Sequence, residues 1–257
     1  MAVPAEAGFV ITVADAVARI TLNKPEKRNA QTPDTWRWLA RVGADLPGSV
    51  RVVLVTGAGP SFSSGLDRTL LADEHSVLSA LARGSAQRAE DAIADYQAGF
   101  GWLAQPRLVS IAAVQGHAVG AGFQLALACD LRVVAADAQF SMAEPRFGLV
   151  PDLGGTKRLV DLVGYAKAAH ICLAGARIDA DEALRAGLAA TVVPADQLLD
   201  AAEAMVSAVL ALPRDAIVET KALLRAAGDR TQSAQEAAER AAQYRRLRDL
   251  AGLLDER

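Results

Sequence analysis

Two segments of this chain share one pattern: a short apolar run rich in β-branched residues, a turn rich in glycine, and then a helical sequence. The first run is VRVVLV (50–55), followed by TGAGPSFSSGLD, and the second is LVSIAAV (108–114), followed by QGHAVGAG. Near-continuous apolar runs of this length are typical of strands covered on both faces of a sheet. Strands of this kind that alternate with helices predict an α/β core.

Each glycine-rich turn leads into a helix, an arrangement that exposes backbone N–H groups able to hold an anion or an oxyanion. A nucleotide-binding interpretation fits neither turn. Gly-x-Gly-x-x-Gly is absent after Gly120, because Leu125 occupies the last position, and residues 57–66 lack the lysine of a P-loop. One such turn is usually only a tight connection, but two turns at the ends of buried strands favour a shared site.

The N-terminal part of the chain adds a hairpin and a helix to this core. Phe9–Val13 and Val17–Leu22 are short apolar runs that predict two paired strands. Pro33 predicts the first turn of a helix with Thr32 as its N-cap. Residues 68–87 have weak periodicity and mixed charge, so we expect a helical lid or a loop there.

The composition excludes several classes of protein. Of 257 residues, 52% are apolar and 22% are charged, which is typical of a globular chain and not of a disordered one. A net charge of −3 without a basic tail argues against nucleic acid as a partner. Cys129 and Cys172 cannot form a disulfide framework and make no metal-ligand spacing with the three histidines. With no secretory signal and no long apolar stretch, we expect a cytoplasmic protein without a membrane segment or a metal.

Four motifs occur in a fixed order along nearly the whole chain. They are ITLNKPEKRNA, VVLVTGAGPSFSSGLD, IAAVQGHAVGAGFQLALACDLRVV and AQFSMAEPRFGLVPDLGGTKRL. In this order the set resembles the enoyl-CoA hydratase/isomerase, or crotonase, family. The resemblance implies a spiral of ββα units over residues 1–194 that holds an acyl-CoA site. It also implies a C-terminal helical oligomerisation region over 195–257, a homotrimer or a hexamer built as a dimer of trimers, and no cofactor beyond the coenzyme A (CoA) of the substrate.

The resemblance also implies where the ligand is held. Carried onto this sequence, the family's oxyanion hole consists of the backbone N–H groups of Ser64 and Ala121. Removing a proton next to a thioester makes an enolate, whose oxygen charge needs such preorganised donors. CoA carries several phosphates, and family position assigns Lys27, Arg28 and Lys221 as the cations that bind them.

Carboxylates decide which reaction such a site runs. Family hydratases use two glutamates, but here the first position is Gln124 and only the second, Glu144, is an acid. Asp152 lies eight residues beyond Glu144, a spacing that resembles the dienoyl-CoA isomerases, although that subgroup also carries an acid at the position of Gln124. From its position before a predicted helix, Asp152 is either a proton carrier or an N-cap. Gln124 either orients a water molecule or is a satisfied polar residue on a helix.

The functional prediction is therefore double-bond isomerisation of an enoyl- or dienoyl-CoA, with Glu144 as the base. One alternative is an enoyl-CoA hydratase, in which Glu144 activates water and Gln124 positions it. The other alternative is a protein that binds acyl-CoA without turning it over.

Overall fold

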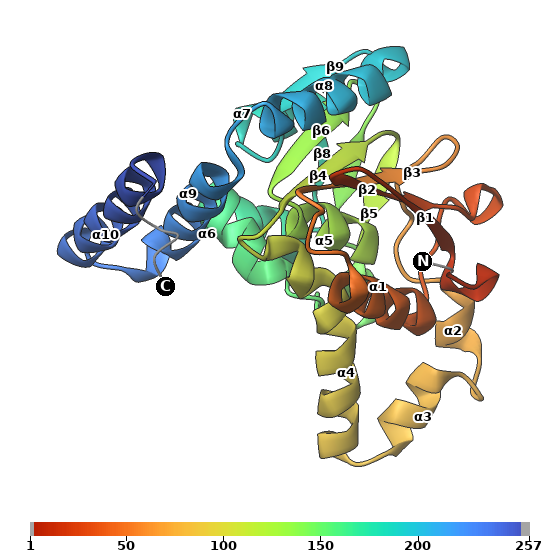
Figure 1. Cartoon of the computed structure of the whole chain (residues 1–257). Coiled ribbons are helices and arrows are strands. Elements are labelled where there is room, and N and C mark those ends of the chain that lie inside the picture. The colour runs from red at the N-terminus through yellow and green to blue at the C-terminus, as the bar shows by residue number, and fades with distance from the viewer. Residues whose placement is uncertain (1–2, 253–257) are drawn as a thin grey trace.

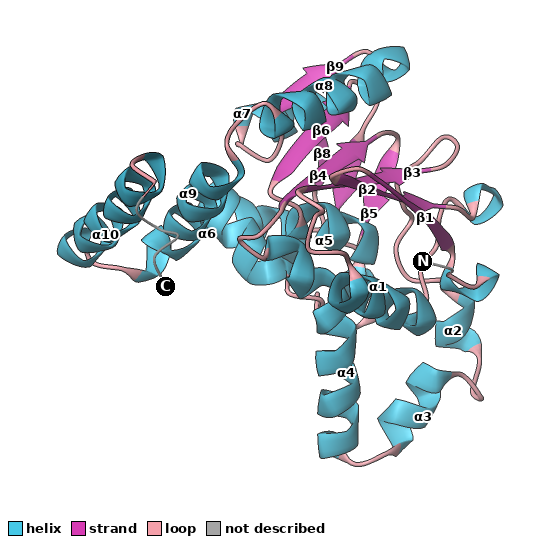
Figure 2. Cartoon of the chain, in the orientation of Figure 1, coloured by secondary structure: helices cyan, strands magenta, loops and turns pink. Residues whose placement is uncertain are grey.

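The main sheet of the protein has six strands in the order β1-β2-β3-β4-β6-β9. The computed structural model describes residues 3–252 and shows the strands gathered together with helices on both sides (Figure 2). β1 and β2 form the predicted antiparallel hairpin, and each later strand pairs in parallel with its neighbour. The strands are β1 (Phe9–Ala14), β2 (Val17–Leu22), β3 (Val52–Gly57), β4 (Val109–Val114), β6 (Leu131–Ala135) and β9 (Thr191–Val193).

A second, smaller sheet stands beside the main one. Its strands are β5 (His117–Val119), β7 (Gln139–Ser141) and β8 (Arg177–Asp179), in the order β5-β7-β8. β5 follows β4 after a two-residue turn and pairs in parallel with β7. The glycine-rich turn after β4 therefore contains a short strand before its helix begins.

Helices alternate with the strands along the chain, and the last three helices follow the last strand (Figure 1). They are α1 (Pro33–Asp45), α2 (Thr69–Ala72), α3 (Val77–Arg83), α4 (Ala86–Gly101), α5 (Ala121–Ala128), α6 (Gly155–Leu173), α7 (Ala180–Arg185), α8 (Leu198–Leu210), α9 (Arg214–Ala226) and α10 (Gln232–Leu250). α1 starts as predicted, because Thr32 accepts a hydrogen bond from the Thr35 N–H in a capping box. The weakly periodic segment before α4 forms the short helices α2 and α3.

The near-continuous apolar strands are explained by the packing of both faces of the main sheet. In β3, Val53 and Val55 face one core with helices α1, α4 and α5, while Val52 and Leu54 face the other. α8 fills that second core with Leu198, Ala202 and Val206. Because side chains alternate along a strand, a strand with a core on each side has no polar face.

The C-terminal helices differ in how they pack. α8 lies on the main sheet, whereas α9 and α10 extend away from it (Figure 1). The exposed apolar side chains of this part include Leu224, Leu247 and Leu250. The division of the chain into a core and a C-terminal helical region at residue 195 stays a prediction. The outermost residues of these two parts, 1–2 and 253–257, lie outside the described residues. Within residues 3–252, no helix combines the length and the apolar character needed to cross a membrane.

Candidate active site

The two glycine-rich turns lie against each other. The Ser63 N–H donates to His117 O at 2.9 Å, and the Val119 N–H donates to Ser63 O at 3.0 Å. A Cβ on Gly65 would lie 2.4 Å from Val119 O, and one on Gly122 would lie 2.6 Å from Ser63 O. Only glycine permits this approach, so the two turns lie in direct contact, as a shared site would require.

A cavity of about 1100 Å³ opens beside the joined turns. Ser64, Ala121, Glu144 and Asp152 all line it, although they come from different parts of the chain. Its other walls are largely apolar and come from the helical segment after β3. They include Leu71, Leu78, Leu81, Ala89, Ile93 and Tyr96. The lid segment expected at residues 68–87 thus forms part of the cavity wall.

The structure corrects one of the two expected oxyanion donors. The Ser64 N–H donates to Arg28 O at 2.8 Å, so this group is already bonded within the protein. The N–H of Ala121, at the first position of α5, has no acceptor among the described residues, and neither has the N–H of Leu66. Leu66 also lines the cavity. The sequence carries no signal that separates Ser64 from Leu66, because both flank Gly65.

Glu144 presents one held and one free carboxylate oxygen. It begins a 3₁₀ turn, Glu144–Phe147, and its Oε1 accepts a hydrogen bond from Gln124 Nε2 at 2.7 Å. Its Oε2 is buried and has no partner among the described residues. Burial raises the pKa of the Glu144 carboxyl, and this effect exceeds the lowering by backbone N–H groups of its own turn and by the Gln124 amide; the charge of Asp152 adds a smaller rise. A carboxylate with a raised pKa and a free oxygen in a cavity suits general acid–base chemistry.

Asp152 is not a helix cap. α6 starts at Gly155 with Gly154 as its N-cap, and no side chain caps it. Asp152 instead lies in the loop before this helix and lines the cavity, where burial raises the pKa of its carboxyl. Of the two interpretations of the sequence, the structure therefore retains the one in which Asp152 is available to a ligand.

Gln124 is a satisfied residue, and both lone pairs of its amide oxygen are in use. Its Oε1 accepts hydrogen bonds from the Leu153 N–H at 2.9 Å and the Gly155 N–H at 3.2 Å. The side chain is fully buried on α5. The amide oxygen therefore has no lone pair left to orient a water molecule.

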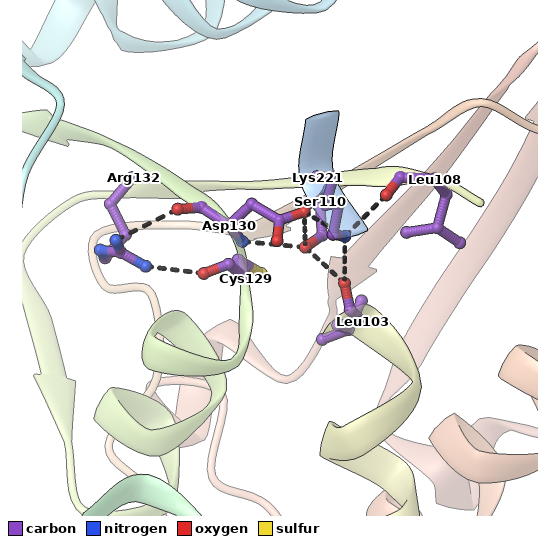
Figure 3. A network of polar contacts seen from close by, with 7 residues as sticks. All are labelled: Leu103, Leu108, Ser110, Cys129, Asp130, Arg132 and Lys221. Carbon is purple, nitrogen blue, oxygen red and sulfur yellow. Dashed lines mark hydrogen bonds and ion pairs between the residues drawn. The ribbon is translucent and has the colours of Figure 1, made fainter. Parts of the chain in front are cut away.

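The three expected CoA-binding cations divide into two groups. Lys27 and Arg28 are exposed at the cavity, where Lys27 pairs with Asp67 at 3.1 Å. Lys221 is buried elsewhere: its Nζ donates to Asp130 Oδ2 at 2.6 Å and to Leu108 O at 2.7 Å (Figure 3). The assignment of Lys221 to CoA is therefore wrong, because its donors already bind groups of the core.

Residues 3–252 contain no cluster of three histidine, cysteine, aspartate or glutamate side chains that could hold a metal ion.

Comparison with known proteins identifies the family. The family model described as enoyl-CoA hydratase/isomerase matches residues 12–249. The chain belongs to this family. A candidate enoyl-CoA hydratase of Thermobifida fusca YX, solved in complex with CoA, superposes with a TM-score of 0.90 at 47% identity over 96% of each chain. Its complex with acetoacetyl-CoA gives a TM-score of 0.89 at 45% identity, covering 95% of this chain and 96% of that one.

Curated members of the enoyl-CoA hydratase/isomerase family are also similar. "Probable enoyl-CoA hydratase echA8" of Mycobacterium bovis is 36% identical over 190 residues, or 73% of this chain and 69% of that protein. "Probable enoyl-CoA hydratase EchA14" of Mycobacterium tuberculosis is 37% identical over 219 residues, or 84% of this chain and 81% of that protein. The protein is therefore an enzyme of this family, with the α/β crotonase fold that the motifs predicted.

Proposed function

We propose that this enzyme isomerises an enoyl- or dienoyl-CoA, moving a double bond along the acyl chain with Glu144 as the base. The observation that carries the proposal is that Glu144 and Asp152 line the same cavity, and that neither carboxyl is fully engaged in hydrogen bonds within the protein. Glu144 keeps Oε2 free, and Asp152 caps no helix. A neutral amide, Gln124, stands where family hydratases have their first glutamate.

The reaction starts with proton transfer to Glu144. Its Oε2 takes a proton from the carbon α or γ to the thioester carbonyl, and the C–H electron pair spreads into a dienolate. The N–H groups of Ala121 and Leu66 donate to the enolate oxygen, each worth about 3–4 kcal/mol of transition-state stabilisation. Protonated Asp152 then delivers a proton to the other end of the dienolate, and the double bond forms at its new position. The substrate loses one proton and gains one, so its composition is unchanged. Proton exchange between the two carboxyls and water then resets the enzyme.

The raised pKa values of both carboxyls suit this cycle. Burial raises the pKa of Glu144 and of Asp152. A raised pKa makes Glu144 a stronger base toward a carbon-bound proton and favours the protonated form of Asp152.

Hydration is the second candidate function, and the names of the similar mycobacterial and Thermobifida proteins favour it. Glu144 would then activate a water molecule that adds to a 2-enoyl-CoA. Because the amide oxygen of Gln124 is occupied, the groups left to hold that water are Glu144 Oε2, Asp152 and the second amide N–H of Gln124.

A panel of enoyl-, dienoyl- and 3-hydroxyacyl-CoA thioesters, followed by absorbance and mass, tests both candidates. Isomerisation changes the absorbance at constant mass, whereas hydration adds the mass of one water. We expect a product of unchanged mass from at least one enoyl or dienoyl substrate. Water addition with no isomerised product would establish the hydratase, and binding without turnover of any thioester would establish a binding protein.

We also propose a homotrimeric assembly that binds CoA with Lys27 and Arg28. The support is the exposed apolar side chains of Leu224, Leu247 and Leu250 on α9 and α10, which a subunit contact would cover. Light scattering at micromolar concentration should give a multiple of three chains, and a monomer would contradict the assembly.

A further inference from the structure

Gln124 joins the two segments that carry the carboxylates. Its amide nitrogen donates to Glu144 Oε1 at 2.7 Å, and its amide oxygen accepts from the Leu153 and Gly155 N–H groups at 2.9 and 3.2 Å. Asp152 immediately precedes Leu153, so one side chain contacts both the turn of Glu144 and the loop of Asp152. We call these three hydrogen bonds the amide clamp.

The clamp is built into the fold and is shielded from solvent. Gln124 is fully buried within α5, a helix whose eight residues are all buried. A Cβ on Gly155 would lie 2.6 Å from Gln124 Cγ, so the absence of a side chain at 155 makes room for the amide. Gly120, which precedes α5, leaves similar room for the carboxylate, because a Cβ there would lie 3.1 Å from Glu144 Oε1.

We propose that Gln124 is a positioning residue that aligns both acid–base groups of the reaction while carrying no proton itself. The inference rests on the proposed function for its catalytic consequence. By holding Oε1, the amide leaves Oε2 of Glu144 as the oxygen that accepts the substrate proton. By holding the Leu153 and Gly155 N–H groups, it fixes the loop from which Asp152 reaches the same cavity.

The variant Gln124→Glu separates the two halves of the clamp. One glutamate oxygen can still accept from Leu153 and Gly155, so the loop keeps its anchor. The donor to Glu144 is lost unless the new carboxyl is protonated, because two ionised carboxylates at this distance repel each other. The variant should therefore work while the pair shares one proton and fail once that proton is released.

Other ionisable groups around Glu144 are common to every variant. Asp152 on the loop before α6 and Cys172 on α6 interact electrostatically with Glu144. Further ionisable groups lining the cavity are Glu26, Lys27, Arg28, Asp67, Arg68, Tyr96 on α4, His117 on β5, Arg146 on the Glu144 turn and Arg177 on β8. Because the wild type keeps all of them, a change of pH profile confined to Gln124→Glu reports the clamp.

The test compares pH profiles of kcat/KM for the wild type, Gln124→Glu, Gln124→Met and Gln139→Glu, on a thioester that the wild type turns over. Gln139 is a matched control, because it is a half-buried glutamine of the same cavity wall with no side-chain hydrogen bond to Glu144. We expect kcat/KM of the wild type and of Gln139→Glu to rise with pH as Glu144 ionises and to fall again only as Asp152 loses its proton. Gln124→Glu should reach its maximum at lower pH and then fall about tenfold per pH unit.

Gln124→Met lacks both halves of the clamp, so its kcat should fall at least tenfold at every pH. A wild-type profile for Gln124→Glu would overturn the proposal. A maximum shifted to the same lower pH in Gln139→Glu would also overturn it, because any added carboxylate would then have the same effect. Thermal melts at each pH exclude unfolding as the source of the fall.

A carboxyl titration by ¹³C NMR separates this inference from the proposed function. Glu144→Gln assigns the Glu144 signal, and its turnover tests the base directly. Retained turnover in Glu144→Gln would contradict the proposed function but would leave the titration readable. The clamp predicts that the Glu144 carboxyl titrates at higher pH in Gln124→Glu than in the wild type, and an unchanged titration would overturn it.

Discussion

The two ends of α5 carry two buried polar clusters that differ in how their charges are satisfied. The cluster at the N-terminal end contains Gln124, Glu144 and Asp152 and opens into the cavity. The cluster at the C-terminal end contains Asp130 and Lys221, and Figure 3 shows its bonds. Both clusters are assembled from distant parts of the chain, and both are at least partly buried. Burial therefore does not distinguish them.

Every charge of the C-terminal cluster has partners within the protein. Asp130 Oδ2 accepts from Lys221 Nζ at 2.6 Å and from the Ser110 N–H at 2.8 Å. Arg132 donates to the backbone carbonyls of Ala126, Cys129 and Leu188, among others. In the N-terminal cluster, Glu144 Oε2 has no partner among the described residues. Paired buried charges hold segments together, whereas an unpaired one lowers stability and remains available to a ligand.

Glu144→Gln tests the unpaired side of this comparison and should have the largest effect. We expect kcat to fall about 10²–10⁴-fold, the usual contribution of a general base. The fold should become more stable at pH 7. A pKa raised by folding favours the native state below the unfolded pKa, and that stability is lost as pH rises through the folded pKa. Turnover and thermal melts measure the two effects, and a lower melting temperature would show that the carboxylate has a structural partner.

Lys221→Met tests the paired side. Removing one partner of a buried ion pair should lower the free energy of unfolding by about 3–5 kcal/mol. The kcat of the folded enzyme and its affinity for CoA should stay at wild-type values, because Lys221 does not line the cavity. Urea unfolding and calorimetry measure these quantities. Lys157→Met is the matched control: its exposed pair with Asp161 should contribute nothing measurable. A selective loss of CoA affinity in Lys221→Met would restore Lys221 to the ligand site.

Asp152→Asn distinguishes catalysis from structure within the N-terminal cluster. We expect a fall of about 10²-fold in kcat, at the lower end for general acid catalysis, with acyl-CoA affinity retained. Burial raises the pKa of Asp152, so removing its charge should leave stability at pH 7 equal or higher. Normal turnover on every thioester of the panel would leave Glu144 as the sole acid–base group of the mechanism.

Lys27→Ala should have the smallest effect, because its charge is exposed and belongs to neither buried cluster. Its ion pair with Asp67 is at the cavity rim, where water screens the interaction. We expect KM for the CoA thioester to rise roughly two- to fivefold, with kcat and stability unchanged. The rise should shrink at high salt. A large loss of kcat would mean that the Lys27–Asp67 pair shapes the catalytic turns.

The elements with strong local signals could be predicted from the sequence. The hairpin of β1 and β2, the Thr32 cap of α1 and the apolar strands β3 and β4 all match. Each depends on neighbours in the chain, through a capping side chain or a run of apolar residues. The strands β5 and β8 were missed, because three residues are too few to show a period.

The candidate site was predictable in part. The sequence indicated that the two turns share a site and that Glu144 is an acid of that site. It left Asp152 open between a proton carrier and an N-cap, and Gln124 open between a water-orienting residue and a satisfied one. It did not indicate which N–H beside Gly65 is free, because the carbonyl that occupies the Ser64 N–H belongs to Arg28, 36 residues earlier in the chain.

By itself, the sequence determined the longer strands and helices, the family and the identity of the ionisable groups, because these follow from local patterns and motif order. Only the tertiary structure decided which of those groups are satisfied. In the sequence, Lys221 is a cation that could bind a phosphate. In the fold, its ammonium group pairs with Asp130, 91 positions away in the chain. Gln124 is an ordinary helix residue in the sequence, yet in the fold it holds Glu144 and the loop of Asp152. Hydrogen-bond partners that are distant in sequence are set by packing, and packing decides which charges remain free for a substrate.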